Sequence, residues 1–225
     1  MRTVVCLHAQ QGGGDALAVD DAHALARALA LGAGHTVTAV LAGPPTHEGL
    51  LRRALAAGAT RAMRVVGEDF GAADFHTLGQ ALGAGIKRFG ADLVLAGARS
   101  DDDGLGAVPA AIARHLGALH VACIESLEVA PGDAGVEIWV RGGGRRRRLR
   151  VPVPAVLSVV ATGAAAPALP EAANADAKIE VLSLVDPEAT VVRRRTELLG
   201  QPELPQRALA QVDSADAFCA ALERG

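Results

Sequence analysis

The stretch that decides the fold is residues 35–66, HTVTAVLAGPPTHEGLLRRALAAGATRAMRVV. It begins with an apolar, β-branched run at residues 35–41, which predicts a buried strand ending at a Gly-Pro-Pro turn. A helix is expected next, with Thr46 as its N-cap and Gly58 at its end. Residues 61–66 predict the following strand, so this stretch forms the strand-helix-strand unit from which parallel sheets are built.

The same alternation continues on both sides of this unit. Residues 2–8 predict a first strand, and the helix through AHALARALAL would be capped at its N-terminus by Asp20 and Asp21. A helix, a strand and a further helix are expected at residues 75–89, 92–96 and 108–116. The predicted fold class is therefore α/β, with three layers and a mostly parallel sheet flanked by helices.

After residue 120 the pattern changes to short strands. A β-meander is predicted at residues 121–129, 136–141 and 147–153, and a last core strand at residues 154–160, PAVLSVV. Residues 161–177 are rich in Ala, Pro and Gly and predict an exposed loop. We expect residues 1–185 to form one domain and residues 186–225 to form an extended C-terminal arm that packs on a partner, because the tail has no core pattern of its own.

Composition argues against several classes of function. The net charge is −3 and only 2% of residues are aromatic, which does not favour a nucleic-acid binder. The apolar runs are shorter than the ~20 residues of a membrane span, and the N-terminus lacks the layout of a signal peptide. Three widely spaced cysteines form no CxxC motif, so neither zinc nor a disulfide framework is expected. We expect a soluble cytoplasmic protein that is not embedded in a membrane.

The strongest candidate for a binding site follows the strand at residues 92–96. That strand runs directly into Gly97, and SDDDGLG at residues 100–106 precedes the next helix, so free amides and the helix dipole would point at one anion. The loops at residues 8–14 and 42–45 would share this edge of a parallel sheet. Together they predict an adenine-nucleotide or other phosphate site. The alternative is that the glycines only make turns, since neither a Walker A loop nor GxGxxG is present.

Two charged clusters leave alternatives open. The three adjacent carboxylates at residues 101–103 are metal ligands or, in better agreement with their spacing, a capping and solvated loop. The six arginines within residues 141–150 form a nucleic-acid patch or, as the acidic net charge favours, a charged hairpin that is solvated or contacts a partner subunit. No nucleophile and base are paired by spacing and no HExxH motif occurs, so we predict a protein that is not an enzyme.

With these motifs in place, the chain resembles the β subunit of electron transfer flavoproteins over roughly residues 1–185. The resemblance lies in residues 38–66, in Asp21 with AHALARALAL, in DLVLAGARSDDDGLGAVPAAIARHLGA from residue 92, in the basic hairpin followed by PAVLSVV, and in Leu169-Pro170 followed by Lys178-Ile179-Glu180. It implies an adenine nucleotide alpha hydrolase-like fold and an electron-transfer carrier without its own catalytic centre.

The resemblance also implies partners and cofactors. Members of the family pair with an α subunit that holds most of the FAD, and the heterodimer passes electrons from an acyl-CoA or N-methyl-amine flavin dehydrogenase to a quinone reductase or another acceptor. By position, AMP would contact Ala9, Ala42, Gly43, Asp103, Gly104, Leu105, Gly106, Ala107 and Val108. Leu169 would insert into a pocket of the dehydrogenase, and the C-terminal arm would wrap the α subunit.

The sequence departs from the family at the nucleotide loop. Residues 105–108, LGAV, stand where relatives carry Asn/Ala-Gln-Thr/Val-Gly, so only backbone donors remain for a phosphate. AMP, a second FAD or no nucleotide are the alternatives for this site. The alternative function is a stand-alone adenine-nucleotide-binding module resembling universal stress proteins.

Overall fold

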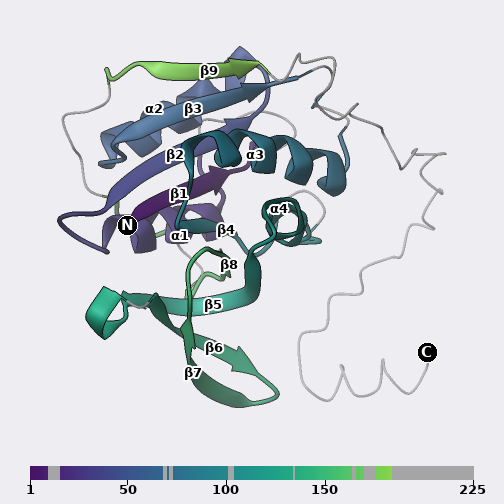
Figure 1. Cartoon of the computed structure of the whole chain (residues 1–225). Helices are drawn as coiled ribbons and strands as arrows, with labels where there is room; N and C mark the ends of the chain where they lie inside the picture. Colours follow the sequence, from purple (N-terminus) through teal and green to yellow (C-terminus); the bar gives the residue numbers. More distant parts are fainter. Residues whose placement is uncertain are drawn as a thin grey trace, which may run out of the picture. The chain divides into compact units, whose positions relative to one another are not determined.

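The structure, a computed structural model of the chain, describes residues 1–9, 16–67, 70, 73–100, 104–133, 135–163, 166–169 and 176–183. Figure 1 shows the arrangement of its helices and strands. The elements of the first half are β1 (Arg2–Leu7), α1 (Val19–Leu29), β2 (Thr36–Ala42), the 3-10 turn η1 (Pro45–His47), α2 (Glu48–Ala56), β3 (Arg61–Val66), α3 (Phe75–Phe89) and β4 (Leu93–Gly97). They are followed by α4 (Val108–Leu116), β5 (Leu119–Val129), β6 (Val136–Gly142), β7 (Arg145–Val151), β8 (Ala155–Val159) and β9 (Ile179–Ser183).

The described strands form one sheet in the order β7-β6-β5-β8-β4-β1-β2-β3-β9. All pairs from β9 to the first half of β5 are parallel, while β5, β6 and β7 pair antiparallel. Figure 1 shows β9 and the β6–β7 hairpin at opposite ends of this sheet. The predicted α/β class, mostly parallel sheet and meander are thereby confirmed.

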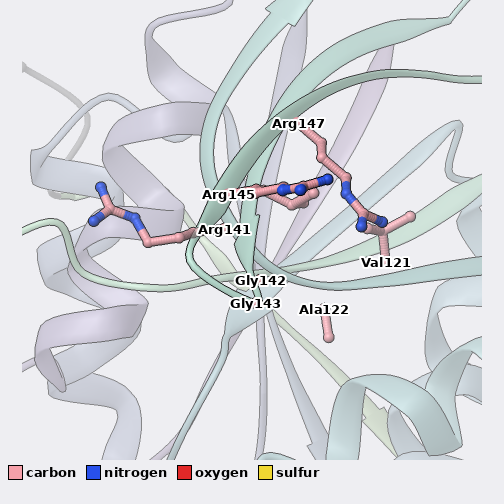
Figure 2. A pocket seen from close by; sticks show the side chains of 8 residues that line it. Val121, Ala122, Arg141, Gly142, Gly143, Arg145 and Arg147 are labelled. Carbon is pink, nitrogen blue, oxygen red and sulfur yellow. The ribbon is translucent and has the colours of Figure 1, made fainter.

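The β6–β7 hairpin extends the antiparallel end of the sheet. Gly143 and Gly144, between the two strands, have φ angles of 57° and 72°, which glycine adopts at little cost. Register places Gly142 opposite Arg145 and Val140 opposite Arg147. Figure 2 shows this turn from close by, with the arginine side chains leaving the ribbon on two sides.

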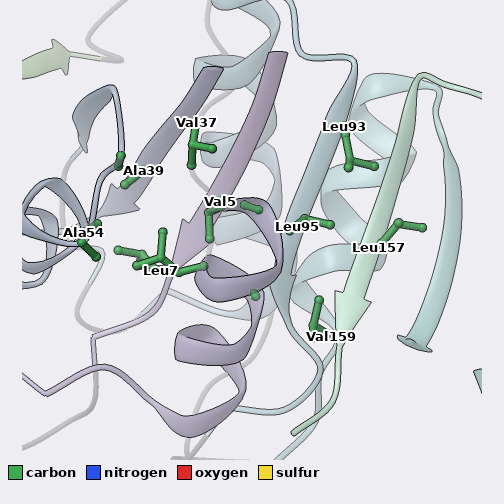
Figure 3. Close-up of a cluster of buried hydrophobic side chains, with 14 of the residues drawn as sticks. Val5, Leu7, Val37, Ala39, Ala54, Leu93, Leu95, Leu157 and Val159 are labelled. Atoms are coloured by element: carbon green, nitrogen blue, oxygen red, sulfur yellow. The ribbon is translucent and has the colours of Figure 1, made fainter. Parts of the chain in front are cut away.

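Two buried clusters give the fold its three layers. Alternate residues of each strand face opposite sides of a sheet, so Val5 and Leu95 pack on one side with α1 and α2 (Figure 3). Cys6 and Val94 pack on the other side with α3 and α4. The helices after β1 and β2 therefore cover one face, and those around β4 cover the other.

Three details differ from the sequence-based predictions. β9 was not expected; it extends the sheet beyond β3, where Arg61 and Glu180 form an ion pair of 2.7 Å. The capping prediction for Asp20 and Asp21 was wrong, because α1 starts at Val19, three residues before the predicted start at Ala22, and has Ala18 as its N-cap. Thr46 does not cap α2 either, since a 3-10 turn precedes that helix. The boundary at residue 185 stays a prediction, and the predicted arm at residues 186–225 lies outside the described residues.

Candidate functional site

The carboxyl ends of β1, β2 and β4 lie side by side at one edge of the sheet. Cys6 of β1 pairs with Val40 of β2 on one side and with Ala96 of β4 on the other. From β1 the chain proceeds outward to β2 and β3, and then returns to place β4 on the opposite side of β1. Open α/β sheets bind ligands at such a switch point, outside the carboxyl ends of the strands. The loops predicted to hold a nucleotide all leave from this edge.

Asp21 ties the ends of β1 and β4 together. Its Oδ2 accepts a hydrogen bond of 2.7 Å from the His8 amide, and its Oδ1 accepts one of 3.0 Å from the Gly97 amide. A Cβ at position 97 would lie 2.5 Å from that Oδ1, so the contact requires glycine there. The first turn of α1 is thereby fastened across the switch point.

Asp20 extends this arrangement to β8. Its Oδ1 accepts a hydrogen bond of 2.7 Å from the amide of Ala161, just beyond β8, and its Oδ2 accepts one of 3.2 Å from the amide of Arg99, just beyond β4. Both aspartates are buried. Sequence reasoning assigned them to helix capping, whereas their carboxylates hold three strand ends in place for the loops that follow.

Burial changes the acidity of the groups beneath the site. Burial raises the pKa of Asp21 to about 6, although the hydrogen bonds from the His8 and Gly97 amides lower it. Burial, and then the nearby carboxylate of Asp21, raise the pKa of the Cys6 thiol. Cys6 therefore stays a neutral thiol at neutral pH and is not a nucleophile.

The loop before α4 depends on glycine. Gly104 and Gly106 have φ angles of 65° and 58°, and a Cβ at position 106 would lie only 2.0 Å from the carbonyl oxygen of Ala98. The loop thus folds back onto the end of β4. Helix α4 has Ala107 as its N-cap, a residue whose side chain cannot accept a hydrogen bond, and Pro109 in its first turn. The side chain of Leu105 is 66% exposed.

The turn after β2 lies at the same edge of the sheet. Gly43 donates its amide to the Val65 carbonyl at 3.1 Å, and its own carbonyl accepts a hydrogen bond of 3.1 Å from the buried Arg64 guanidinium. Glu48 accepts a hydrogen bond of 2.8 Å from the Nε of Arg64, and this ion pair neutralises the guanidinium. The buried Nδ1 of His47 has no hydrogen-bond partner in the part of the chain that the structure describes, and a Cβ on Gly43 would lie 2.9 Å from it. His47 is a polar group that sequence reasoning missed.

The structure brings most of the predicted contact residues to one edge. Ala9 follows β1, Ala42 ends β2, and the loop at residues 104–108 follows β4. Asp103 and the neighbouring carboxylates at residues 101 and 102 lie outside the described residues. Leu169 is half-buried and packs against the same core cluster as α1 and α2. Its predicted role toward a dehydrogenase stays a prediction.

The described part of the chain offers no cluster of three or more His, Cys, Asp or Glu side chains that could hold a metal ion. Within residues 1–183, where described, no helix is long and apolar enough to cross a membrane. The site at the sheet edge is built chiefly from backbone groups and from carboxylates that are already bonded to amides. Such an arrangement can bind and orient an anion.

Comparison with known proteins identifies the family of this chain. The family model described as "Electron transfer flavoprotein domain" matches residues 5–187. The chain is 38% identical over 112 residues to the electron transfer flavoprotein subunit beta of Clostridium acetobutylicum, covering 49% of this chain and 43% of the relative. It is 29% identical over 193 residues to the subunit beta of Syntrophomonas wolfei, covering 80% and 75%.

A further relative has a different name. The chain is 34% identical over 142 residues to Protein FixA of Azorhizobium caulinodans, covering 59% of this chain and 50% of that protein. Several of these matches thus span about half the length of the curated relatives. The family model covers most of the chain, and the relatives that resemble this chain include subunits beta from several bacteria. This chain belongs to the electron transfer flavoprotein family and is of its β-subunit type.

Proposed function

We propose that this chain is the β subunit of a heterodimeric electron transfer flavoprotein. In this role it carries electrons rather than catalysing a reaction, passing them from a flavin dehydrogenase of the acyl-CoA or N-methyl-amine type to a quinone reductase or another acceptor. The match of the electron transfer flavoprotein domain to residues 5–187 is the observation that carries the proposal. FAD, held mainly by the α subunit, supplies the electron-accepting group when it is bound.

We also propose that the sheet-edge site holds AMP. Three features support the fit: the N-cap of α4 is Ala107, which has no side-chain acceptor, Gly106 lets the loop lie against β4, and the buried Nδ1 of His47, beside Gly43, has no hydrogen-bond partner among the described residues. The amides of residues 106–108 would receive the phosphate. Ala9 and Ala42 would flank the nucleotide with small side chains that leave it room.

The remaining assignments concern segments away from this site. Residues 186–225 would pack on the α subunit, and Leu169 would contact the dehydrogenase. Cys6 and Cys123 form no disulfide among the described residues, which supports a reducing, cytoplasmic location.

Co-expression tests the pairing on which this proposal depends. The full chain with an affinity tag is produced together with the untagged α subunit of the same organism and purified by the tag. We expect both chains to elute as one species by size exclusion, with the visible absorption of bound flavin. A tagged chain that elutes alone, colourless, while binding adenine nucleotides would contradict the heterodimer and favour a stand-alone nucleotide-binding module.

A further inference from the structure

The arginines of the β6–β7 hairpin are divided between two faces. Side chains along a strand alternate, so Arg146, Arg148 and Arg150 lie on one face of β7 while Arg145 and Arg147 lie on the other. The division matters because only the first set is ion-paired among the described residues.

The arginines of the first face, together with Arg141 of β6, are ion-paired within the chain, with four guanidinium groups sharing two carboxylates. Glu125 accepts hydrogen bonds from Arg141 at 2.6 Å and from Arg146 at 3.0 Å. Glu137 accepts hydrogen bonds from both Arg148 and Arg150. These bonds, that of Arg150 first, hold the pKa of Glu137 below its usual value, so it is charged at neutral pH.

The second face carries the two remaining arginines of β7, Arg145 and Arg147. Neither Arg145 nor Arg147 forms an ion pair with any residue that the structure describes. Both line a hollow of about 490 Å³ together with Val121, Ala122 and the Gly142 turn. Figure 2 shows these two side chains on one side of the hairpin, with Arg147 reaching toward Val121, while Arg141 points to the other side.

Apolar side chains continue the same face. Leu149 lies two residues after Arg147 along β7, and therefore on the same face, and is 38% exposed. Leu119, which is 49% exposed, pairs with Ala155, a member of the core cluster beneath α1 and α2. We call the surface formed by Leu119, Val121, Val140, Arg145, Arg147 and Leu149 the open face of the hairpin.

We propose that the open face is the docking surface for the α subunit, at a place where that subunit presents carboxylates between apolar side chains. The proposal rests on the proposed function. Two arginines two residues apart repel each other unless an anion lies between them, and acidic side chains of a partner supply that anion in bidentate geometry. The exposed leucines on the same face favour a protein surface over a small anion, which would fill only the hollow.

A pair of matched double variants tests the docking surface. Arg145→Gln with Arg147→Gln removes two charges from the open face, whereas Arg148→Gln with Arg150→Gln removes two charges from the same strand on the paired face. The control variant loses ion pairs within the chain, so any loss of binding that is caused by a destabilised fold should be larger in the control variant. Affinity of each full-length chain for the α subunit is measured by biolayer interferometry at two salt concentrations, with thermal unfolding as the check of folding.

We expect the variant of the open face to bind the α subunit at least tenfold more weakly and with a reduced dependence on salt, and the control to bind within threefold of wild type. Equal affinities of the two variants would overturn the docking surface and leave the heterodimer intact. Failure of the wild-type chain to bind the α subunit would overturn the proposed function itself. Loss of binding to pyrophosphate in the open-face variant, with α-subunit affinity unchanged, would show that the hollow serves a small anion and would also overturn the docking proposal.

Discussion

The loop before α4 allows a prediction from two glycines that share a conformation and differ in their surroundings. Gly104 and Gly106 both have positive φ, at 65° and 58°. A Cβ on Gly104 would meet no atom of the described residues within 4 Å, while a Cβ on Gly106 would lie 2.0 Å from the Ala98 carbonyl oxygen. Substitution by alanine therefore adds backbone strain at both positions and a collision at only one.

The magnitudes follow from these two effects. A left-handed conformation costs a non-glycine residue about 1–2 kcal/mol, so Gly104→Ala should lose about that much. In Gly106→Ala the loop must also move by more than about 1 Å to reach a normal carbon–oxygen contact, and overpacking adds about 1–3 kcal/mol. Thermal unfolding should show this extra loss as a midpoint lower than that of Gly104→Ala by at least about 2–4 °C.

The nucleotide content of the purified heterodimer provides the second readout. A displaced loop moves the first amides of α4, so we expect the Gly106→Ala complex to lose bound AMP and the Gly104→Ala complex to retain it. Equal midpoints and equal AMP content in the two variants would refute the reasoning, because they would mean that the close approach of Gly106 to Ala98 shapes neither the loop nor the site.

Two further predictions concern the layers beneath and beside the site. The pKa of Asp21 is about 6 in the folded chain against 3.8 ordinarily, so the folded chain binds this proton more tightly than the unfolded chain does. The stabilisation by this protonation is fully present below about pH 4 and is lost as the pH rises through about 6, a change of about 3 kcal/mol in the free energy of unfolding. Urea unfolding of wild type and Asp21→Asn at pH 4.5 and pH 7 should show the wild type gaining relative to the variant at the lower pH, and a constant difference would contradict the pKa assignment. Gly79→Ala should destabilise by about 1–3 kcal/mol despite better helix propensity, because the added Cβ would lie 2.3 Å from the Cβ of Ala111 where α3 crosses α4. A gain in the unfolding midpoint of Gly79→Ala would contradict this close crossing.

Local patterns were enough to predict the class of the fold. The β-branched runs that became β1, β2 and β4, and the helices of residues 75–89 and 108–116, are confirmed within one or two residues. The strand IEVLS at Ile179–Ser183 was missed because only one of its residues is fully buried, as is common at a sheet edge. Its pairing with β3 depends on a chain separation that no local pattern reports.

The sequence predicted which loops share one edge of the sheet, but not which contacts hold that edge together. The rule that parallel sheets bind ligands at the carboxyl ends of their strands pointed to the loops after β1, β2 and β4, which the sheet order does bring to one edge. The role of Asp20 could not be read from its neighbours, because it bonds to the amide of Ala161, which is 141 positions away. His47 gave no signal either, since its approach to Gly43 depends on the 3-10 turn between them.

Identification of the cofactors released from the purified heterodimer tests the central claim most directly. The complex of the full chain with its α subunit is denatured, and the released nucleotides are identified by mass spectrometry and counted against the protein. The account predicts one FAD and one AMP for each pair of chains. A pair of chains that releases no flavin would contradict the assignment of this protein to electron transfer.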